Sequence, residues 1–272
     1  VVLYFENIDP GFIIHVEPTS VTTCVSDPRF DEQWGLQAIK ACSAWKITKG
    51  DTNVRVAVID GGIDTIHSEF DSSHVVFSYD IEINSSPAHA YCKEPNRDNN
   101  NPDPHSCFFH GLHVGGIIFA NHNSDSIAGV APKTSMINIS SLFNTNDSLP
   151  IKLAQAINLS LSYEAKVINN SWGDAGGTFT LLHCTMLEEA IDNAIDSGCV
   201  VVFSAGNNDN DSVNYPASYR PEILVVSSIS QNYFLQGCAN YNKGLDVVAP
   251  GAEILSTHMY ISTHNEYGYL ES

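Results

Sequence analysis

The chain is poor in positive charge and has no long apolar run. Its 272 residues include 12 Lys and Arg against 31 Asp and Glu, for a formal net charge of −19. A field of that sign repels phosphate backbones and anionic lipids, which argues against nucleic acid and membrane surfaces as partners. No stretch approaches the roughly 18 uninterrupted apolar residues that a membrane-spanning helix needs. Cations and neutral or basic peptides stay compatible, although surfaces that are merely soluble are often acidic too.

The seven cysteines include no C-x-x-C pair. This argues against a zinc ribbon and against a thioredoxin-like site. Cys92 and Cys107 flank a polar loop and could form a disulfide in an exported protein. Free thiols throughout are an equally good interpretation. The cysteine pattern therefore leaves the redox compartment open.

Length and composition predict one large α/β domain, because 43% of the residues are hydrophobic and only 16% are charged. Apolar residues at helical spacing predict helices over residues 153–161 and 187–195, with Gly198 as the stop of the second. A further helix is expected over the run HVGGIIFA, which follows His110. Strands alternating with helices predict a three-layer parallel sheet with helices on both faces and functional residues at the strands' carboxyl ends. The predicted strands are short β-branched runs at 54–59, 135–139, 165–168, 199–203 and 223–226.

The domain boundary is predicted near residue 27, where the pattern of apolar and polar residues changes. Residues 1–26 show no sustained period and are interpreted as a lead-in or propeptide remnant, and residues 27–272 as the domain. The sequence starts without an initiator Met or a basic, apolar signal segment, so we expect it to be part of a longer protein. The polar stretch 96–105 is predicted to be a surface insertion, and we expect a monomer.

Four short motifs fall where this architecture collects functional groups. They are VAVIDGGID with Asp60, HGLHVGG with His110, INNSWG with Ser171, Trp172 and Gly173, and FSAGNN with Asn207. Together, and joined by YPASY and DVVAPGAEILST, they resemble the subtilisin-like (subtilase) family of serine proteases from about Asp27 to Ser272. The resemblance implies a subtilisin-like fold, polypeptide substrates and a secreted or otherwise extracytoplasmic location.

The resemblance also implies catalytic roles. Acyl transfer by a hydroxyl needs a base, a carboxylate that orients the base, and donors for the oxyanion. Asp60 corresponds to the orienting carboxylate, His110 to the base and Asn207 to the oxyanion donor, while His113 corresponds to a structural histidine. An Asp after a strand can also cap a turn, and Asn is common in turns, but the motif context favours catalysis.

A substrate pocket is implied at two further places. The backbone of Ser171, Trp172 and Gly173 matches a segment that lines the first specificity pocket and pairs with an extended peptide. Asn214 takes the place of a pocket residue that is often Gly, so its side chain should narrow the pocket or make it more polar. Packing of Trp172 in the core is the alternative interpretation of that residue.

No cofactor is needed for this chemistry, but a structural calcium ion is implied. The run NHNSDSI, which contains Asn123, follows the expected helix as a calcium loop does in some subtilases, and Glu69 matches a carboxylate ligand. Oxygen ligands suit this hard cation. A solvated turn is an equally good interpretation.

The sequence departs from the family pattern in several places. Gly61 replaces a hydroxyl residue, which removes one hydrogen bond to Asp60, Leu112 replaces the Thr of HGTH, and Gly115 replaces an Ala. The family's nucleophile lies in GTSMA, and no such string occurs here. We expect that segment, and the C-terminal portion of the domain, to follow Ser272, and the 272 residues alone to be inactive.

Two other functions are compatible with parts of the sequence. A pseudoprotease would bind peptides without cleaving them, and Gly61, Leu112 and the absent GTSMA favour it slightly. A metal hydrolase could use His110 and His113 with Asp60, but the interval lacks the glutamate base of HExxH enzymes. A dinucleotide site is not expected, because no G-x-G-x-x-G loop follows the first strand.

Overall fold

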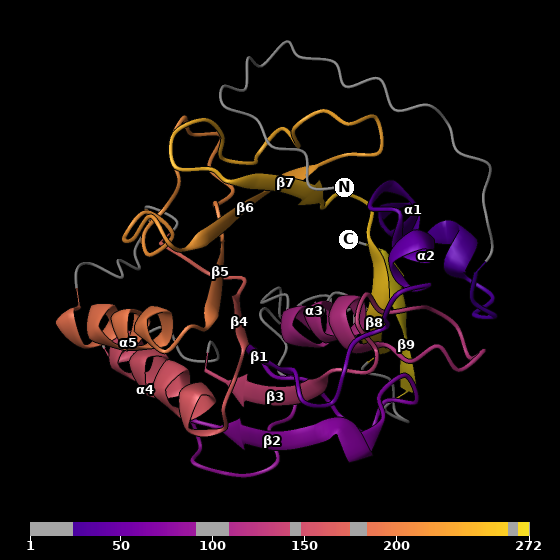
Figure 1. Ribbon diagram of the computed structural model, residues 1–272, viewed down its shortest axis with the longest axis horizontal. Helices are drawn as coiled ribbons and strands as arrows, with labels where there is room; N and C mark the ends of the chain where they lie inside the picture. Colours follow the sequence, from indigo (N-terminus) through magenta and orange to yellow (C-terminus); the bar gives the residue numbers. More distant parts are fainter. Residues whose placement is uncertain (1–23, 91–108, 142–147, 175–183, 261–265, 272) are drawn as a thin grey trace, which may run out of the picture.

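A parallel sheet forms the centre of the molecule (Figure 1). The computed structural model describes residues 24–90, 109–141, 148–174, 184–260 and 266–271. Seven strands pair in parallel in the order β2-β3-β1-β4-β5-β6-β7, which confirms the predicted α/β class. They are β1 (Arg55–Asp60), β2 (Val75–Asp80), β3 (Ser135–Ser140), β4 (Val167–Asn170), β5 (Val200–Ser204), β6 (Leu224–Ile229) and β7 (Val247–Pro250).

Helices cover both faces of the sheet, as predicted (Figure 1). On one face lie α4 (Leu149–Ser162) and α5 (Thr185–Asp196), and on the other lies α3 (His110–Phe119), beside the antiparallel hairpin of β8 (Leu255–Tyr260) and β9 (Glu266–Glu271). Near the N-terminal end of the described chain the short elements are η1 (Phe30–Glu32), α1 (Trp34–Ala38) and α2 (Ala41–Ala44), and η2 (Ser72–His74) precedes β2.

The central strand β1 explains the two-sided core. Ala57 and Ile59 belong to the cluster that packs against α4 and α5. Val58, on the opposite face, packs with Leu112 and Phe119 of α3. Because successive side chains of a strand point to opposite faces, a strand buried on both sides must be apolar throughout. This is the physical origin of the apolar run at residues 56–59, the buried part of VRVAVI.

The stop of α5 is as the sequence indicates. Gly198 has a φ of +77°, a left-handed conformation that favours glycine. The N–H of Gly198 donates to the carbonyl of Ile195 at 2.9 Å, and that of Cys199 to the carbonyl of Ala194 at 3.0 Å. These two bonds satisfy carbonyls that the helix leaves open, and the chain then turns into β5.

Boundaries and edge elements differ from the predictions. The helix predicted to follow the first histidine begins at His110 itself. The edge strand β2 was not predicted, because its side chains are only partly buried and it lacks a continuous apolar run. The stretch 96–105 lies outside the described residues.

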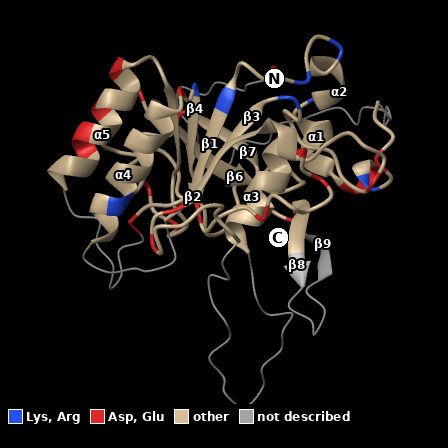
Figure 2. Cartoon of the chain, turned by 90° about the horizontal axis from the view of Figure 1, so that it is seen from below, with Lys and Arg blue, Asp and Glu red and all other residues tan. Residues whose placement is uncertain are grey.

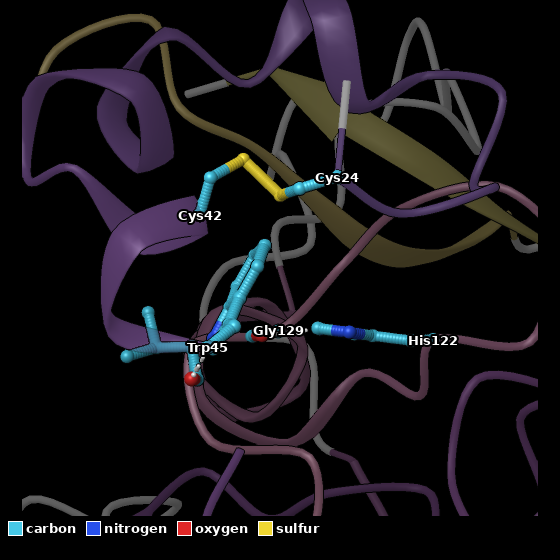
Figure 3. Close-up of a disulfide and its surroundings, with 6 residues drawn as sticks. Cys24, Cys42, Trp45, His122 and Gly129 are labelled. Carbon is cyan, nitrogen blue, oxygen red and sulfur yellow. Dashed lines mark hydrogen bonds between the residues drawn. A yellow bond between two sulfur atoms is a disulfide. The ribbon is translucent and has the colours of Figure 1, made fainter. Parts of the chain in front are cut away.

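A disulfide joins Cys24 to Cys42, with their Cα atoms 5.6 Å apart (Figure 3). The interpretation of free thiols throughout is therefore wrong. The predicted pair, Cys92 and Cys107, lies outside the described residues. Sequence reasoning missed the observed pair because no local motif marks it, and pairing depends on how the chain folds back. Among the described cysteines, Cys184, Cys199 and Cys238 carry free thiols.

The disulfide lies beside a small apolar cluster, called the cap here, that packs against the loop following α3 (Figure 3). The buried residues of the cap are Val25, Phe30, Leu36, Ala41 and Trp45. Trp45, next to α2, donates its indole N–H to the Val130 carbonyl at 2.8 Å. Its ring meets the ring of His122 edge-on, with the ring centroids 4.4 Å apart. His122 Nε2 donates to the Gly129 carbonyl at 3.0 Å. Burial lowers the pKa of His122, so the ring is neutral near pH 7.

Acidic side chains are conspicuous on α5 (Figure 2). Its sequence TMLEEAIDNAID places four carboxylates on one helix.

The described part of the chain contains no helix that combines the length and the apolarity needed to cross a membrane.

Candidate active site

Asp60 and His110 meet at the carboxyl end of β1. Asp60 is the last residue of that strand and is only 1% exposed, whereas the His110 side chain is 27% exposed. His110 Nδ1 lies 2.8 Å from one carboxylate oxygen of Asp60 and 2.9 Å from the other. A carboxylate only accepts, so Nδ1 carries the proton and donates it. The ring is thus fixed with Nε2 directed away from Asp60.

The turn after β1 and the start of α3 are packed too closely for larger residues. The N–H of Gly61 donates to Asp60 Oδ1 at 2.7 Å, so the backbone supplies a donor although residue 61 has no hydroxyl. A Cβ on Gly111 would lie 2.5 Å from the carbonyl oxygen of Gly62. Glycine at residue 111 therefore lets the helix bring His110 up to the strand end.

His113 has the structural role that was expected. It is buried, and its Nε2 donates to the carbonyl of Ile254 at 2.9 Å. The next strand, β8, is tied to the same helix: Ser256 Oγ donates to the His113 carbonyl and Thr257 Oγ1 to the Leu112 carbonyl. Because His113 Nε2 is bonded to the main chain, the geometry does not favour a site that shares one metal ion between His113 and His110.

Asn207 lies on an exposed turn after β5. Gly206 before it has a φ of +108°. Strands β1, β4 and β5 are neighbours in the sheet, so Asp60, the segment after β4 and the Asn207 turn share one carboxyl edge. The strand order therefore places the Asn207 turn at the same edge of the sheet as the Asp60–His110 pair.

The segment after β4 runs beside the segment that contains Asn214. The N–H of Asp174 donates to the Tyr215 carbonyl at 2.8 Å, and a Cβ on Gly173 would lie 3.8 Å from the Cβ of Asn214. Ser171 Oγ accepts from Asn169 Nδ2 at 2.9 Å. The two predicted pocket segments are therefore in contact.

The side chain of Trp172 belongs to the core, as the alternative interpretation held. It is buried and its Nε1 donates to the Ile59 carbonyl at 3.0 Å. Its ring meets Phe203 edge-on, with centroids 4.9 Å apart. The indole therefore supports the neighbouring strand ends and does not line a pocket.

The predicted calcium ligands come from two segments that are in contact, since Glu69 precedes η2 and Asn123 lies on the loop after α3. Glu69 is fully buried, and its Oε1 accepts from the N–H of Ile127 at 3.0 Å. Asn123 is exposed, and its side-chain oxygen accepts from the Asp125 N–H at 2.8 Å. The described residues include no group of three or more His, Cys, Asp or Glu that could hold a metal ion. Calcium also takes amide and backbone oxygens, so the loop remains chemically suitable.

Two carboxylates near these sites were missed by the sequence reasoning. Asp27 Oδ1 accepts from the N–H groups of Asn123 and Ser124 at 3.1 and 3.0 Å, and in the described part of the chain its buried Oδ2 has no hydrogen-bond partner. Asp64, in the VAVIDGGID motif, lies 3.2 Å from His89 Nδ1. Only the motif position of Asp64 gave a sequence signal, whereas Asp27 acquires its contacts through folding.

Sequence comparison assigns the chain to a family. The profile of the Subtilase family, Peptidase_S8, matches residues 51–271. The chain belongs to the subtilase family, as its motifs indicated.

The relatives are serine proteases. The chain is 34% identical over 239 residues to the thermophilic serine proteinase of Bacillus sp. (strain AK1), covering 88% of this chain and 53% of that protein. It is 34% identical over 235 residues to thermitase of Thermoactinomyces vulgaris, covering 86% of this chain and 75% of that protein. It therefore spans about half the length of the first of these relatives.

A solved structure shares the fold. A protease from Pseudoalteromonas arctica PAMC 21717 superposes with a TM-score of 0.76 at 26% identity, covering 92% of this chain and 82% of that one. Two Bacillus subtilis (strain 168) relatives differ in location. The major intracellular serine protease is 31% identical (82% of this chain, 66% of that protein), and the minor extracellular protease Epr is 30% identical (84% and 31%).

Proposed function

We propose that the protein is a serine endopeptidase that cleaves polypeptides through an Asp60–His110 pair, with Asn207 as oxyanion donor. The observation that carries the proposal is the hydrogen bond from His110 Nδ1 to the buried Asp60 carboxylate, at the sheet edge where the Asn207 turn also lies. The proposal takes its nucleophilic serine from the GTSMA-type segment that the family resemblance implies.

Asp60 and His110 would divide the acid–base work. With Nδ1–H donated to Asp60, the lone pair of His110 sits on Nε2, where it can accept the proton of a serine hydroxyl. As the hydroxyl oxygen attacks the scissile carbonyl, Nε2 gains that proton and the imidazolium is stabilised by the Asp60 charge. The same proton then passes to the leaving amine, so His110 returns to its starting state.

The other groups would bind the substrate and stabilise the oxyanion. The Asn207 amide would donate to the oxyanion that forms as the carbonyl becomes tetrahedral. The backbone of residues 171–173 would pair with an extended substrate as an added strand, which accepts many sequences because it contacts main chain. Asn214 would limit the size of the side chain that precedes the cut.

The test uses the full-length protein, a polypeptide substrate and a serine-directed phosphonylating reagent. Cleavage and covalent labelling are both expected, and His110→Ala should lower kcat by about 10⁶-fold, the order found in subtilisin. Peptide binding with neither cleavage nor labelling would favour a pseudoprotease. Cleavage blocked by a chelator but not by the reagent would favour a metal hydrolase.

A structural calcium ion is a separate part of the proposal. Glu69 and Asn123 would supply carboxylate and amide oxygens. The partnerless Oδ2 of Asp27, whose Oδ1 accepts from the N–H of Asn123, supports a cation there. Millimolar calcium should raise the melting temperature, and Glu69→Gln should abolish that rise. A melting temperature that responds to neither calcium nor chelator would remove the ion from the proposal.

We also propose that the protein works outside the cytoplasm. The Cys24–Cys42 disulfide supports an oxidising compartment. The relatives alone do not decide, because they include one named intracellular and one named extracellular. Non-reducing mass mapping of the native protein should recover Cys24 and Cys42 in one linked peptide pair. Two reduced peptides would contradict this location.

A further inference from the structure

Asn240 lies directly behind the turn that carries Asn207. Its side chain is fully buried. Its Oδ1 accepts from the N–H of Asn208 at 2.9 Å and from the N–H of Asn210 at 3.2 Å. Its Nδ2 donates to the carbonyl of Ala205 at 3.0 Å. One side chain therefore fastens the backbone on both sides of residue 207.

The same residue completes a closed amide network. Asn240 Nδ2 also donates to Asn214 Oδ1 at 3.0 Å, and Asn214 Nδ2 donates to Asn208 Oδ1 at 2.8 Å. The Asn240 main-chain N–H donates to the Gly206 carbonyl at 2.9 Å. Both donor hydrogens and both acceptor positions of the Asn240 amide are thus used, so no isosteric side chain reproduces the pattern. This satisfaction also fixes which way round the amide lies.

Gly206 shows how tightly the turn rests on this network. Its φ of +108° is open to glycine, and a Cβ there would lie 2.3 Å from Asn214 Nδ2 and 2.6 Å from Asn240 Nδ2. The turn backbone therefore packs directly on the two amide groups. Asn240 is anchored in turn, because Ser227 Oγ donates to its carbonyl at 2.6 Å.

Asn207 itself is held through the backbone of its neighbours. Its side chain is exposed and, in the part of the chain that the structure describes, makes no hydrogen bond of its own. A donor that stabilises a transition state must already point at the developing charge. Where the Asn207 amide points is therefore set by the residues that fix the main chain at 205, 206 and 208.

We propose that Asn240 is the positioning residue for the Asn207 amide. It bonds the carbonyls of residues 205 and 206 and the N–H groups of 208 and 210, and so sets the backbone frame from which Asn207 projects. The inference rests on the proposed oxyanion role of Asn207. It adds a residue from a different segment, between β6 and β7, to the machinery of the site.

The test compares Asn240→Ala, Asn240→Asp and Leu153→Ala in the full-length protein. Asn240→Ala should lower kcat by on the order of 10²-fold with KM nearly unchanged, because displacing a catalytic group by about 1 Å has a cost of that order. Asn240→Asp keeps the acceptor for the two N–H groups and should fall between wild type and Asn240→Ala. Leu153→Ala, in the distant α4 layer, should lower the melting temperature without lowering kcat. Amide exchange of residues 206–214 should accelerate in Asn240→Ala alone.

A double-mutant cycle separates the two proposals. With Asn207→Ala already present, Asn240→Ala should have little further effect on kcat, because the group it positions is gone. An equal loss in both backgrounds, or a loss that Leu153→Ala reproduces, overturns the positioning role and leaves the Asn207 assignment intact. An Asn207→Ala variant with normal kcat overturns the oxyanion assignment itself, while faster exchange at 206–214 would still report the Asn240 contacts.

Discussion

The Asp60–His110 side of the site is held by buried secondary structure, whereas the Asn207 side is a turn held by amide hydrogen bonds. Asp60 ends β1 and His110 begins α3, and both elements are packed into the apolar core. The Asn207 turn is exposed, and its frame is the Asn240 side chain with its partners. The first geometry depends on non-directional packing, and the second on a few directional bonds that single substitutions can remove.

Of the two sides, the packed side has the larger expected effect. Asp60→Asn should lower kcat by about 10⁴-fold, because an Asn that donates toward Nδ1 favours the tautomer with its proton on Nε2. Steady-state kinetics on the full-length protein would measure this, with little change in KM expected. Asp64→Asn is the matched control, since Asp64 is a buried carboxylate of the same motif that contacts His89. Equal losses in both variants would contradict a specific role for Asp60.

The next effect is on the turn side. Asn207→Ala should lower kcat by roughly 10² to 10³-fold, the usual cost of removing one oxyanion donor, with KM almost unchanged. Asn193→Ala, an exposed Asn on α5, is the control and should behave as wild type. A loss carried wholly by KM would make Asn207 a ground-state binding residue and remove the distinction between the two sides.

The packed side was also the more predictable from sequence. The apolar run of β1, its end at Asp60 and the helix at His110 are local patterns, and local patterns determine where strand ends and helix starts fall. The role of Asn240 is not local, because its partners lie about thirty residues earlier in the chain. The motif FSAGNN indicated the turn but not what supports it.

The same reasoning explains the other differences. The Trp172 motif position indicated a pocket, but the direction of the indole was set by the gap between Ile59 and Phe203, which exists only once β1 and β5 are in place. Cys24 and Cys42 pair because the chain before η1 folds back over α2. Both depend on tertiary packing, which the local patterns of a single sequence do not reveal.

Removing the disulfide tests how robust the packed side is. The Cys24→Ser/Cys42→Ser double variant should lose roughly 3 kcal/mol of unfolding free energy, as expected for a closed loop of this size. The cap it holds packs on the loop after α3, so stability should fall while kcat at a permissive temperature stays unchanged. Denaturant titration would measure the loss, and Cys238→Ser, an exposed free thiol, should cause none. A large fall in kcat would show that the Asp60–His110 geometry depends on the cap.

The smallest expected effect is on selectivity, through Asn214. Asn214→Gly should raise the ratio of kcat/KM for a large aromatic over a small side chain before the cut, because Asn214 lies against Gly173 and its removal frees volume. The variant also breaks the bonds to Asn208 and Asn240, so turnover of every substrate should drop together. The ratio cancels that common loss and isolates pocket size. Asn214→Ala, which loses the same amide but keeps the Cβ, should lower turnover similarly and shift the ratio less. An unchanged ratio in Asn214→Gly would mean that Asn214 serves only the amide network of the turn.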